Sequence, residues 1–165
     1  MSIEPQNAEL ERYRAFLRTK ITLAQDHGDT VEIGDLNPIL KPHQRAIVEW
    51  AVRGGRRGIF TSFGLGKSCI QLETLRLILE REGGRAMIVA PLGVRQEFAR
   101  DARMLGIPLK FIRRIEDCTP SPESRIPNPD IFITNYETVR DGKLAPAQFT
   151  ATSLDEASVL RSFGG

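Results

Sequence analysis

The segment TSFGLGKS at residues 61–68 has the residue types and spacing of a phosphate-binding loop. Gly64 and Gly66 allow backbone angles and a close approach that side chains would block. The amides of such a loop, together with the N-terminus of a following helix, can face a polyphosphate. Lys67 can then reach the β- and γ-phosphates, and Ser68 can offer its hydroxyl to Mg²⁺.

The strict form of this loop begins with glycine, whereas this chain has Thr61 at that position. A glycine-rich turn with a surface lysine is the alternative interpretation. The loop follows a predicted strand at 58–61 and precedes a predicted helix at 67–82, and this context favours phosphate binding. The residues that we expect to hold a nucleotide in the loop are Gly64, Leu65, Gly66, Lys67, Ser68 and Cys69.

The acidic pair Asp155 and Glu156 follows the last predicted strand, 150–154. Mg²⁺ bound to a nucleotide takes few carboxylates beside phosphate oxygens and waters. Asp155 would hold the water shell of the metal opposite Ser68, and Glu156 would orient and deprotonate the attacking water. Acidic pairs also cap helices, and Ser153 with Asp155 could do so here. The position of the pair after a phosphate loop and three intervening strands favours the role at the metal.

Short apolar runs alternate with amphipathic stretches from residue 58 onward, which is typical of an α/β fold. Nearly continuous apolar strands separated by helices predict a buried parallel sheet with helices on both faces. Ligands of such sheets bind beyond the carboxyl ends of the strands, where the loop and the acidic pair fall. The predicted strands are 58–61, 86–90, 109–112, 131–134 and 150–154, and the predicted helices are 67–82 and 94–105.

Two further helices are expected ahead of the loop. Apolar residues at helical spacing predict one amphipathic helix at 7–26 and a second helix from Pro42 to Gly54. Glycine and proline residues interrupt the pattern between these helices. We therefore divide the chain into an N-terminal helical extension at 1–37 and a nucleotide-binding lobe at 38–165.

The composition is that of an ordinary globular chain of 165 residues, of which 41% are hydrophobic and 27% are charged. The net charge of +2 is too small to imply polyanion binding by itself. The two cysteines, Cys69 and Cys118, argue against a disulfide framework or a zinc site. The sequence starts without an apolar segment after a basic one, and its longest apolar stretch, 87–94, is too short to span a membrane. We therefore expect no membrane partner and a cytoplasmic location.

Several segments together resemble the motifs of superfamily 2 helicases of the Swi/Snf type, which are DEAD/DEAH-like. LKPHQ at 40–44 is similar to the adenine-reading segment of this family, and TSFGLGKS is similar to motif I. VAPLGVRQEF at 89–98 resembles motif Ia, ITNYETVR at 133–140 resembles the segment around motif Ib, and LDEAS at 154–158 resembles motif II. The similarity covers residues 40–160 and is greatest to helicases encoded by bacteriophages and prophages.

The resemblance implies a RecA-like P-loop NTPase lobe that hydrolyses ATP with Mg²⁺, using Lys67 and Glu156 as catalytic residues. Gln44 would pair with the edge of adenine, since its amide both donates and accepts hydrogen bonds. Motifs Ia and Ib of the family contact the nucleic-acid backbone, and Arg95 and Thr134 lie just beyond predicted strands at that edge. DNA is the favoured partner.

The net charge of residues 95–114, six basic against two acidic side chains, is +4. This excess suits a salt-sensitive contact with nucleic-acid phosphates that is independent of base sequence. A solvated helix face with ordinary arginines is the alternative.

Two features of the family are not found in this sequence. One is the second RecA-like lobe, whose arginine fingers stabilise the transition state. The other is the motif III strand, which lies between the phosphate-loop strand and the motif II strand, so we expect a gap in the sheet and a loosened Mg²⁺ site. We interpret the chain as the N-terminal piece of a longer helicase or translocase, and we expect the 165-residue chain alone to bind ATP weakly and to hydrolyse little.

Two other functions remain open. A small P-loop kinase would need a lid with arginines, and the proline-rich stretch 118–129 contains only Arg125. Phosphoryl transfer to a small acceptor would identify such a kinase. A non-catalytic module would instead bind nucleotide or DNA without turning over ATP.

Overall fold

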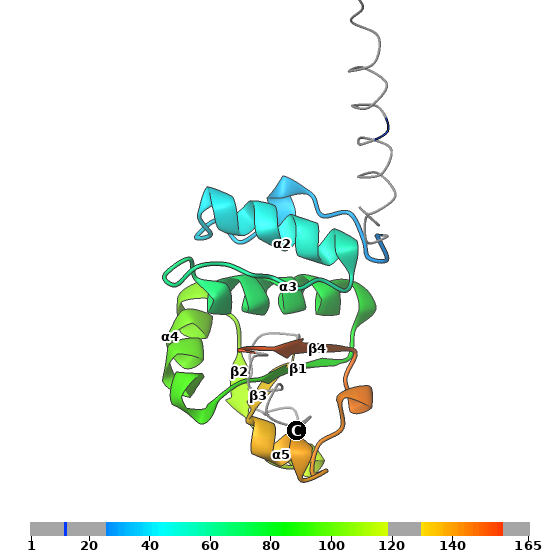
Figure 1. Cartoon of the computed structure of the whole chain (residues 1–165), viewed down its shortest axis with the longest axis vertical. Coiled ribbons are helices and arrows are strands. Elements are labelled where there is room, and N and C mark those ends of the chain that lie inside the picture. Colours follow the sequence, from blue (N-terminus) through cyan, green and yellow to red (C-terminus); the bar gives the residue numbers. More distant parts are fainter. Residues whose placement is uncertain (1–11, 13–25, 119–129, 157–165) are drawn as a thin grey trace, which may run out of the picture.

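The computed structural model describes residue 12 and residues 26–118 and 130–156. The predicted helix at 7–26 lies outside these residues except at its Arg12 and Asp26, and so does most of the proline-rich stretch. The described part forms an α/β fold around one parallel sheet, with helices above and below it (Figure 1). The predicted fold class is thereby confirmed at the level of its architecture.

The sheet has four parallel strands in the described residues, in the order β2-β3-β1-β4. In register, Met87 of β1 lies between Phe132 of β3 and Thr152 of β4. The predicted strands that begin near residues 86, 109, 131 and 150 are confirmed within one residue at their starts. The strands are β1 (Arg85–Val89), β2 (Leu109–Phe111), β3 (Asp130–Thr134) and β4 (Ala151–Leu154).

The helices form layers on the sheet. α3 packs on one face of the sheet, α2 lies on the outer side of α3, and α5 lies on the opposite side of the sheet (Figure 1). The three longer helices confirm the sequence prediction. The helices are α2 (Pro42–Gly54), α3 (Lys67–Glu82), α4 (Arg95–Leu105) and α5 (Tyr136–Arg140), with 3-10 turns at Ile33–Asp35, Leu92–Val94, Ile115–Asp117 and Pro146–Gln148.

The core explains why α3 is apolar on more than one side. Its Leu72 and Ile70 are fully buried in one cluster with Val48 of α2 and Ile88 of β1. A helix that is covered on two sides carries apolar residues around most of its circumference. The strands alternate, so Met87 faces a second cluster on the other side of the sheet. Burying each of these side chains contributes about 2 kcal/mol, and together they hold α3 and the loop before it against the sheet.

The structure corrects one predicted strand. Residues 58–61 form no strand, and Phe60 is 98% exposed. Among the described residues, β4 is the last strand on this side of the sheet, and the segment pairs with none of the four strands. A short extended segment without a neighbour cannot satisfy its amides and carbonyls by pairing, so it remains an irregular connection in contact with water.

Candidate functional site

The glycine loop leads directly into α3, as the sequence predicts. Gly66 is the N-cap of α3 with φ 74° and ψ 49°, and Gly64 has φ 79°. Both angles lie in the left-handed region, which glycine adopts without steric cost. At Gly66 a Cβ would also lie 2.2 Å from Nε2 of Gln44. The loop conformation therefore depends on glycine twice at this position, once for the angle and once for the space.

The glycine loop has backbone N–H groups that are available to a ligand. Within the described residues, the N–H groups of Gly64, Leu65 and Gly66 donate no hydrogen bond to the protein backbone. They stand beside the N-terminus of a 16-residue helix, whose dipole favours an anion. Lys67 folds back over the loop, with its Nζ 3.3 Å from the carbonyl oxygen of Thr61. The arrangement has the donors and the charge that a phosphate group requires.

Gln44 fastens the start of α2 to the glycine loop. Its Nε2 donates to the carbonyl of Leu65 at 3.1 Å, and its Oε1 accepts from the amide of Lys41 at 2.9 Å. A ring nitrogen of His43 also lies 3.3 Å from the Leu65 carbonyl. Gln44 is 7% exposed, so its amide supports the loop from beneath. The expected pairing of Gln44 with adenine stays a prediction.

The acidic pair lies at the end of β4, where β4 leaves the sheet. The amide of Asp155 donates to the carbonyl of Val89 at 2.8 Å, and its carbonyl accepts from the hydroxyl of Tyr136 at 2.5 Å. Burial raises the pKa of the Tyr136 hydroxyl, and the charges of Asp155 and Glu156 raise it further. The phenol therefore stays protonated and continues to donate at neutral pH.

Gln71 connects α3 to the acidic pair, and the sequence analysis did not identify it. Its Nε2 donates to Oδ1 of Asp155 at 2.8 Å, while its Oε1 accepts from the hydroxyl of Ser153 at 2.8 Å. Gln71 stands four residues after Lys67 and so on the same face of α3. That spacing is the signal in the sequence that could have indicated it.

Glu156 has an unusual backbone conformation. Its φ is 51°, and among the described residues it is the one non-glycine residue with a positive φ. Such a conformation costs about 1 kcal/mol or more and is concentrated at functional sites. Asp155 and Glu156 thus form a bend directly after β4.

Ser68 does not face Asp155 as the sequence analysis expected. Its hydroxyl donates a hydrogen bond to Oδ2 of Asp101, a buried residue of α4. Its neighbour Cys69 is also buried, and burial followed by the nearby Asp101 charge raises the pKa of its thiol to about 11. The thiol therefore stays protonated, and Cys69 contributes its backbone position and its packing to the site. The correction follows from the tight packing of α3 on α4, which brings Asp101 to the first turn of α3.

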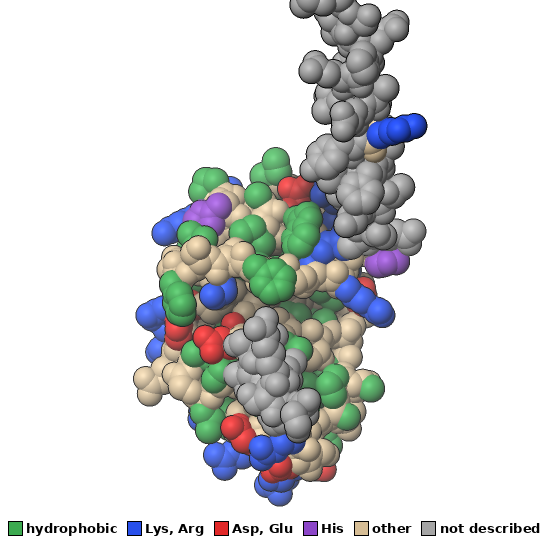
Figure 2. Space-filling view, in the orientation of Figure 1, with side chains coloured by type: hydrophobic (Ala, Val, Ile, Leu, Met, Phe, Trp, Pro, Cys, Tyr) green, Lys and Arg blue, Asp and Glu red, His purple; other side chains and the backbone are tan. Residues whose placement is uncertain are grey.

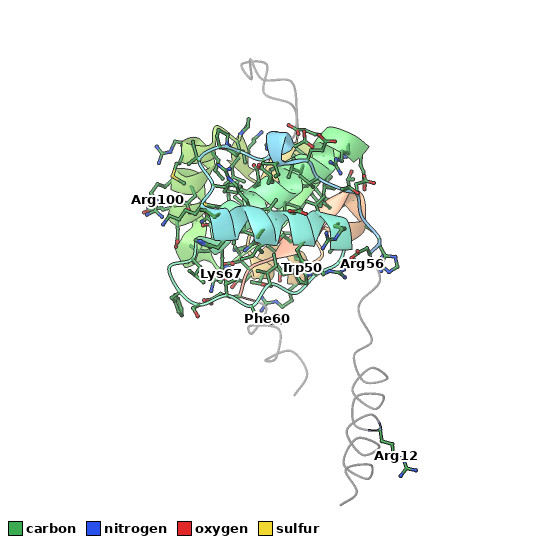
Figure 3. All side chains as sticks on the ribbon, turned by 90° about the horizontal axis from the view of Figure 1, so that it is seen from above. Arg12, Trp50, Arg56, Phe60, Lys67 and Arg100 are labelled. Atoms are coloured by element: carbon green, nitrogen blue, oxygen red, sulfur yellow. The ribbon has the colours of Figure 1, made fainter. Side chains whose placement is uncertain are left out.

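A cleft of about 1210 Å³ joins these parts. One wall is formed by residues 58–63 and by Lys67, which flank the glycines of the loop, and the other is β4 with the acidic pair. Lys67 and Gln71 project from α3 into the same cleft. Lys67, Trp50 and Phe60 lie along one side of the molecule in the view of Figure 3. Apolar side chains are exposed on the face shown in Figure 2. Among the residues that line the cleft, Phe60 is 98% exposed and Phe63 is 90% exposed.

The oxygen atoms at this cleft suit Mg²⁺ only in company with a nucleotide. No group of three or more histidine, cysteine, aspartate or glutamate residues that could hold a metal occurs in the described part of the chain. Mg²⁺ that is bound with a nucleotide needs one or two protein oxygens and takes the others from phosphates and waters. The Asp155 carboxylate lines the cleft and is a hard oxygen ligand of that kind, whereas the Ser68 hydroxyl is turned to Asp101. Asp155 would therefore hold a metal that arrives with phosphate.

The two residues expected to contact nucleic acid differ in their surroundings. Arg95 is exposed, and its guanidinium lies 4.2 Å from the ring centroid of Phe111, where Arg113 also lies at 5.7 Å. Thr134 is 1% exposed, and its hydroxyl donates to the carbonyl of Ile112 at 2.9 Å. Thr134 thus stabilises the junction of β2 and β3, and we leave it out of the surface that a polyanion could reach.

No model of a known protein family matches this chain, and a search of curated proteins finds no relative. No helix among the described residues is long and apolar enough to cross a membrane. The argument about function therefore depends on the residues and contacts of the cleft.

Proposed function

We propose that this chain is the N-terminal, RecA-like ATP-binding part of an ATP-dependent nucleic-acid helicase or translocase. The observation that carries the proposal is one cleft lined by Lys67 after a glycine loop and by Asp155 and Glu156 after a parallel strand. A basic loop and a carboxylate pair on opposite walls are the two parts that nucleoside triphosphate hydrolysis needs.

In this proposal the chain's own groups divide the work. The amides of Gly64–Ser68 cradle the phosphates, and Lys67 leaves the Thr61 carbonyl to bind the β- and γ-phosphates. Asp155 orients the waters around Mg²⁺, which neutralises developing charge when it is bound. Glu156 orients the attacking water and accepts its proton.

Nucleic acid would bind beside the carboxyl ends of β1 and β2. Arg95 stands there with Arg113 around the Phe111 ring, in a stretch with a net charge of +4 between residues 95 and 114. Guanidinium groups in this setting bind backbone phosphates without reading the base sequence. DNA remains the favoured partner through the resemblance to Swi/Snf-type helicases.

Titration of the 165-residue chain with ATP and Mg²⁺ tests the site, with the amide resonances of Gly64 and Gly66 as the readout. We expect weak saturable binding that Lys67→Ala reduces about tenfold, since a charge-assisted contact is lost. Lys143→Ala is the matched control, because Lys143 is exposed and pairs with Asp141. The proposal would be contradicted if ATP and Mg²⁺ did not shift these amide resonances in the wild type, or if they shifted them equally in Lys67→Ala.

Hydrolysis tests the acidic wall separately. We expect little turnover from the 165-residue chain, because its described residues include no second lobe that could supply arginine fingers. In a longer form of the protein that hydrolyses ATP, Glu156→Gln should preserve nucleotide binding and stop hydrolysis. Full turnover in that variant would show that the role assigned to Glu156 is wrong. Transfer of phosphate to a small acceptor would favour a kinase instead.

A further inference from the structure

Gln71 of α3 joins the acidic pair to the helix that follows the glycine loop. Its Nε2 donates to Oδ1 of Asp155 at 2.8 Å, and its Oε1 accepts from the Ser153 hydroxyl at 2.8 Å. Gln71 and Asp155 both line the cleft, so their contact lies in the space that the proposed function assigns to the nucleotide. None of the motifs identified in the sequence contains Gln71, and the proposed function gives it no role.

The two neighbours of the Gln71 amide determine how it is oriented. An ionised carboxylate only accepts hydrogen bonds, so the amide must present its N–H₂ group to Asp155. Its oxygen then faces Ser153, whose hydroxyl donates to it. The reversed amide would place two acceptors against each other at Asp155. The amide is therefore held in one orientation, with its N–H₂ group on Oδ1 of Asp155.

The Asp155 carboxylate keeps one oxygen for a ligand. Its Oδ1 is engaged by Gln71, whereas its Oδ2 accepts no hydrogen bond from any of the described residues. The backbone of Asp155 is held as well, by the Val89 carbonyl and by the Tyr136 hydroxyl. With its backbone and one oxygen held, the carboxylate has little freedom to rotate, and Oδ2 has a defined position in the cleft wall.

α3 sets the spacing between this carboxylate and the phosphate end of the cleft. Gln71 lies four residues after Lys67, which places both residues on one face of α3 and about 6 Å apart along its axis. Mg²⁺ that is bound with a nucleotide has to reach a phosphate and a protein carboxylate at the same time. One turn of a single helix thus relates the residue at the phosphates to the residue that holds the carboxylate.

We propose that Gln71 is a positioning residue that holds Asp155 in the orientation in which its carboxylate receives the metal of a metal–nucleotide complex. The inference rests on the proposed function, because it assumes that a nucleotide and Mg²⁺ bind in the cleft. Gln71 acts through Asp155 and contacts neither nucleotide nor metal. Partners of this kind fix the orientation of a metal ligand, and their loss lowers metal affinity by about 10- to 100-fold.

Gln71→Met tests this role, because methionine has a similar length and helix propensity but makes neither hydrogen bond. The measured quantity is the ratio of the ATP affinity in Mg²⁺ to the ATP affinity in EDTA. We expect this ratio to fall about tenfold, while the affinity in EDTA is unchanged because Lys67 and the glycine loop are intact. Gln96→Met is the matched control, because Gln96 is an exposed glutamine of α4 that does not line the cleft.

Ser153→Ala separates the positioning role from a purely structural tie between α3 and β4. It removes the other hydrogen bond of the same amide and leaves the contact with Asp155 in place. A positioning role predicts a ratio close to that of the wild type in Ser153→Ala, whereas a structural tie predicts similar losses in both variants. Similar losses would therefore overturn the inference. An unchanged ratio in Gln71→Met would do the same, and a raised ratio would mean that Gln71 competes with the metal for Asp155.

A double-variant cycle locates the effect at Asp155. Asp155→Asn should lower the ratio by itself, because it removes the charge that attracts the metal. In that background Gln71→Met should lower the ratio no further. Additive losses would show that Gln71 acts on the metal by another route and would contradict the inference.

The outcomes also separate this inference from the proposed function. If the wild-type chain binds ATP neither in Mg²⁺ nor in EDTA, both fail. If it binds ATP but Mg²⁺ does not change the affinity, or changes it equally in Gln71→Met, only the role of Gln71 fails. Should Gln71→Met not fold, a crystal structure of the wild type with ADP and Mg²⁺ is the second test. We expect Gln71 to donate to Oδ1 of Asp155 while Oδ2 faces the metal, and a Gln71 turned away from Asp155 would contradict the inference.

Discussion

β1 and the segment at residues 58–61 are both short apolar runs, yet β1 is a central strand of the sheet and the other segment forms no strand. β1 pairs with β3 on one side and β4 on the other, and four of its five residues are buried. The other segment pairs with no strand of the described sheet, and its Phe60 is almost completely exposed. The difference lies in the neighbours, because an apolar run becomes a strand only where another strand satisfies its backbone.

The two walls of the cleft also differ in the contacts that hold them in place. The acidic wall is held by three hydrogen bonds of Asp155, which donates to Val89 and accepts from Gln71 and from Tyr136. The loop wall is held from beneath by Gln44 and at its end by α3. We infer that the acidic wall is the more rigid of the two and that ligand binding orders the loop wall more.

The largest expected effect is a difference in stability between a substitution in β1 and a substitution in the unpaired segment at residues 58–61. Ile88 is fully buried between α3 and the sheet, so Ile88→Ala should lower the free energy of unfolding by about 3 kcal/mol. Phe60→Ser removes a larger side chain, but this side chain is exposed to water. The substitution should therefore change the free energy of unfolding by less than about 0.5 kcal/mol. Urea denaturation of both variants measures the two values. Equal losses would mean that residues 58–61 are packed in solution.

The next largest effect is expected at Gly64 and Gly66, the two loop glycines with a positive φ. Gly66→Ala strains the backbone and also drives a Cβ into the side chain of Gln44, so we expect a loss of about 2 kcal/mol or more. Gly64→Ala meets no atom within 4 Å and should cost about 1 kcal/mol for its φ alone. Thermal unfolding monitored by circular dichroism ranks the pair. A larger loss in Gly64→Ala would show that Gln44 does not support the loop.

Most of the sheet and the three long helices could be predicted from the sequence. The continuous apolar runs that became β1 and β3 are buried on both faces, and this burial produces the pattern that the prediction uses. Residues 58–61 have the same local pattern. Their failure to form a strand depends on which segments lie beside them in space, and a local pattern does not contain that information.

Only part of the candidate site could be predicted from the sequence, for the same reason. The glycine loop and the acidic pair were predicted, because each is a contiguous run placed after a predicted strand. Gln71 and Asp101 were not, because their hydrogen bonds join residues 84 and 33 positions apart. Those contacts depend on how α3 is rotated against β4 and α4, which is set by side-chain packing. Thr134 follows a strand as predicted, but its hydroxyl turns inward to Ile112.

A smaller effect tests the rigidity of the acidic wall. Tyr136→Phe keeps the ring in the core beneath the sheet and removes only the hydroxyl that donates to the Asp155 carbonyl. We expect the free energy of unfolding to fall by about 1 kcal/mol and the Asp155 amide to exchange faster with deuterium. Hydrogen exchange followed by mass spectrometry or NMR measures the second effect. Unchanged exchange at Asp155 would mean that the contact does not hold this wall.

The smallest effect concerns the protonation of Cys69, which lies where the loop wall joins α3. The thiol has a pKa of about 11 in the folded chain against 9.0 as its ordinary value, so the unfolded chain releases this proton first as the pH rises. The contribution of Cys69 to stability is complete below pH 9 and is lost progressively as the pH rises toward 11. Denaturation of the wild type and of Cys69→Ala at pH 8.5 and 9.5 should therefore show the wild type losing more, by at most about 0.5 kcal/mol after solvent screening. A parallel fall in both proteins would place the thiol in contact with water and would make the loop wall more open than its packing on Asp101 indicates.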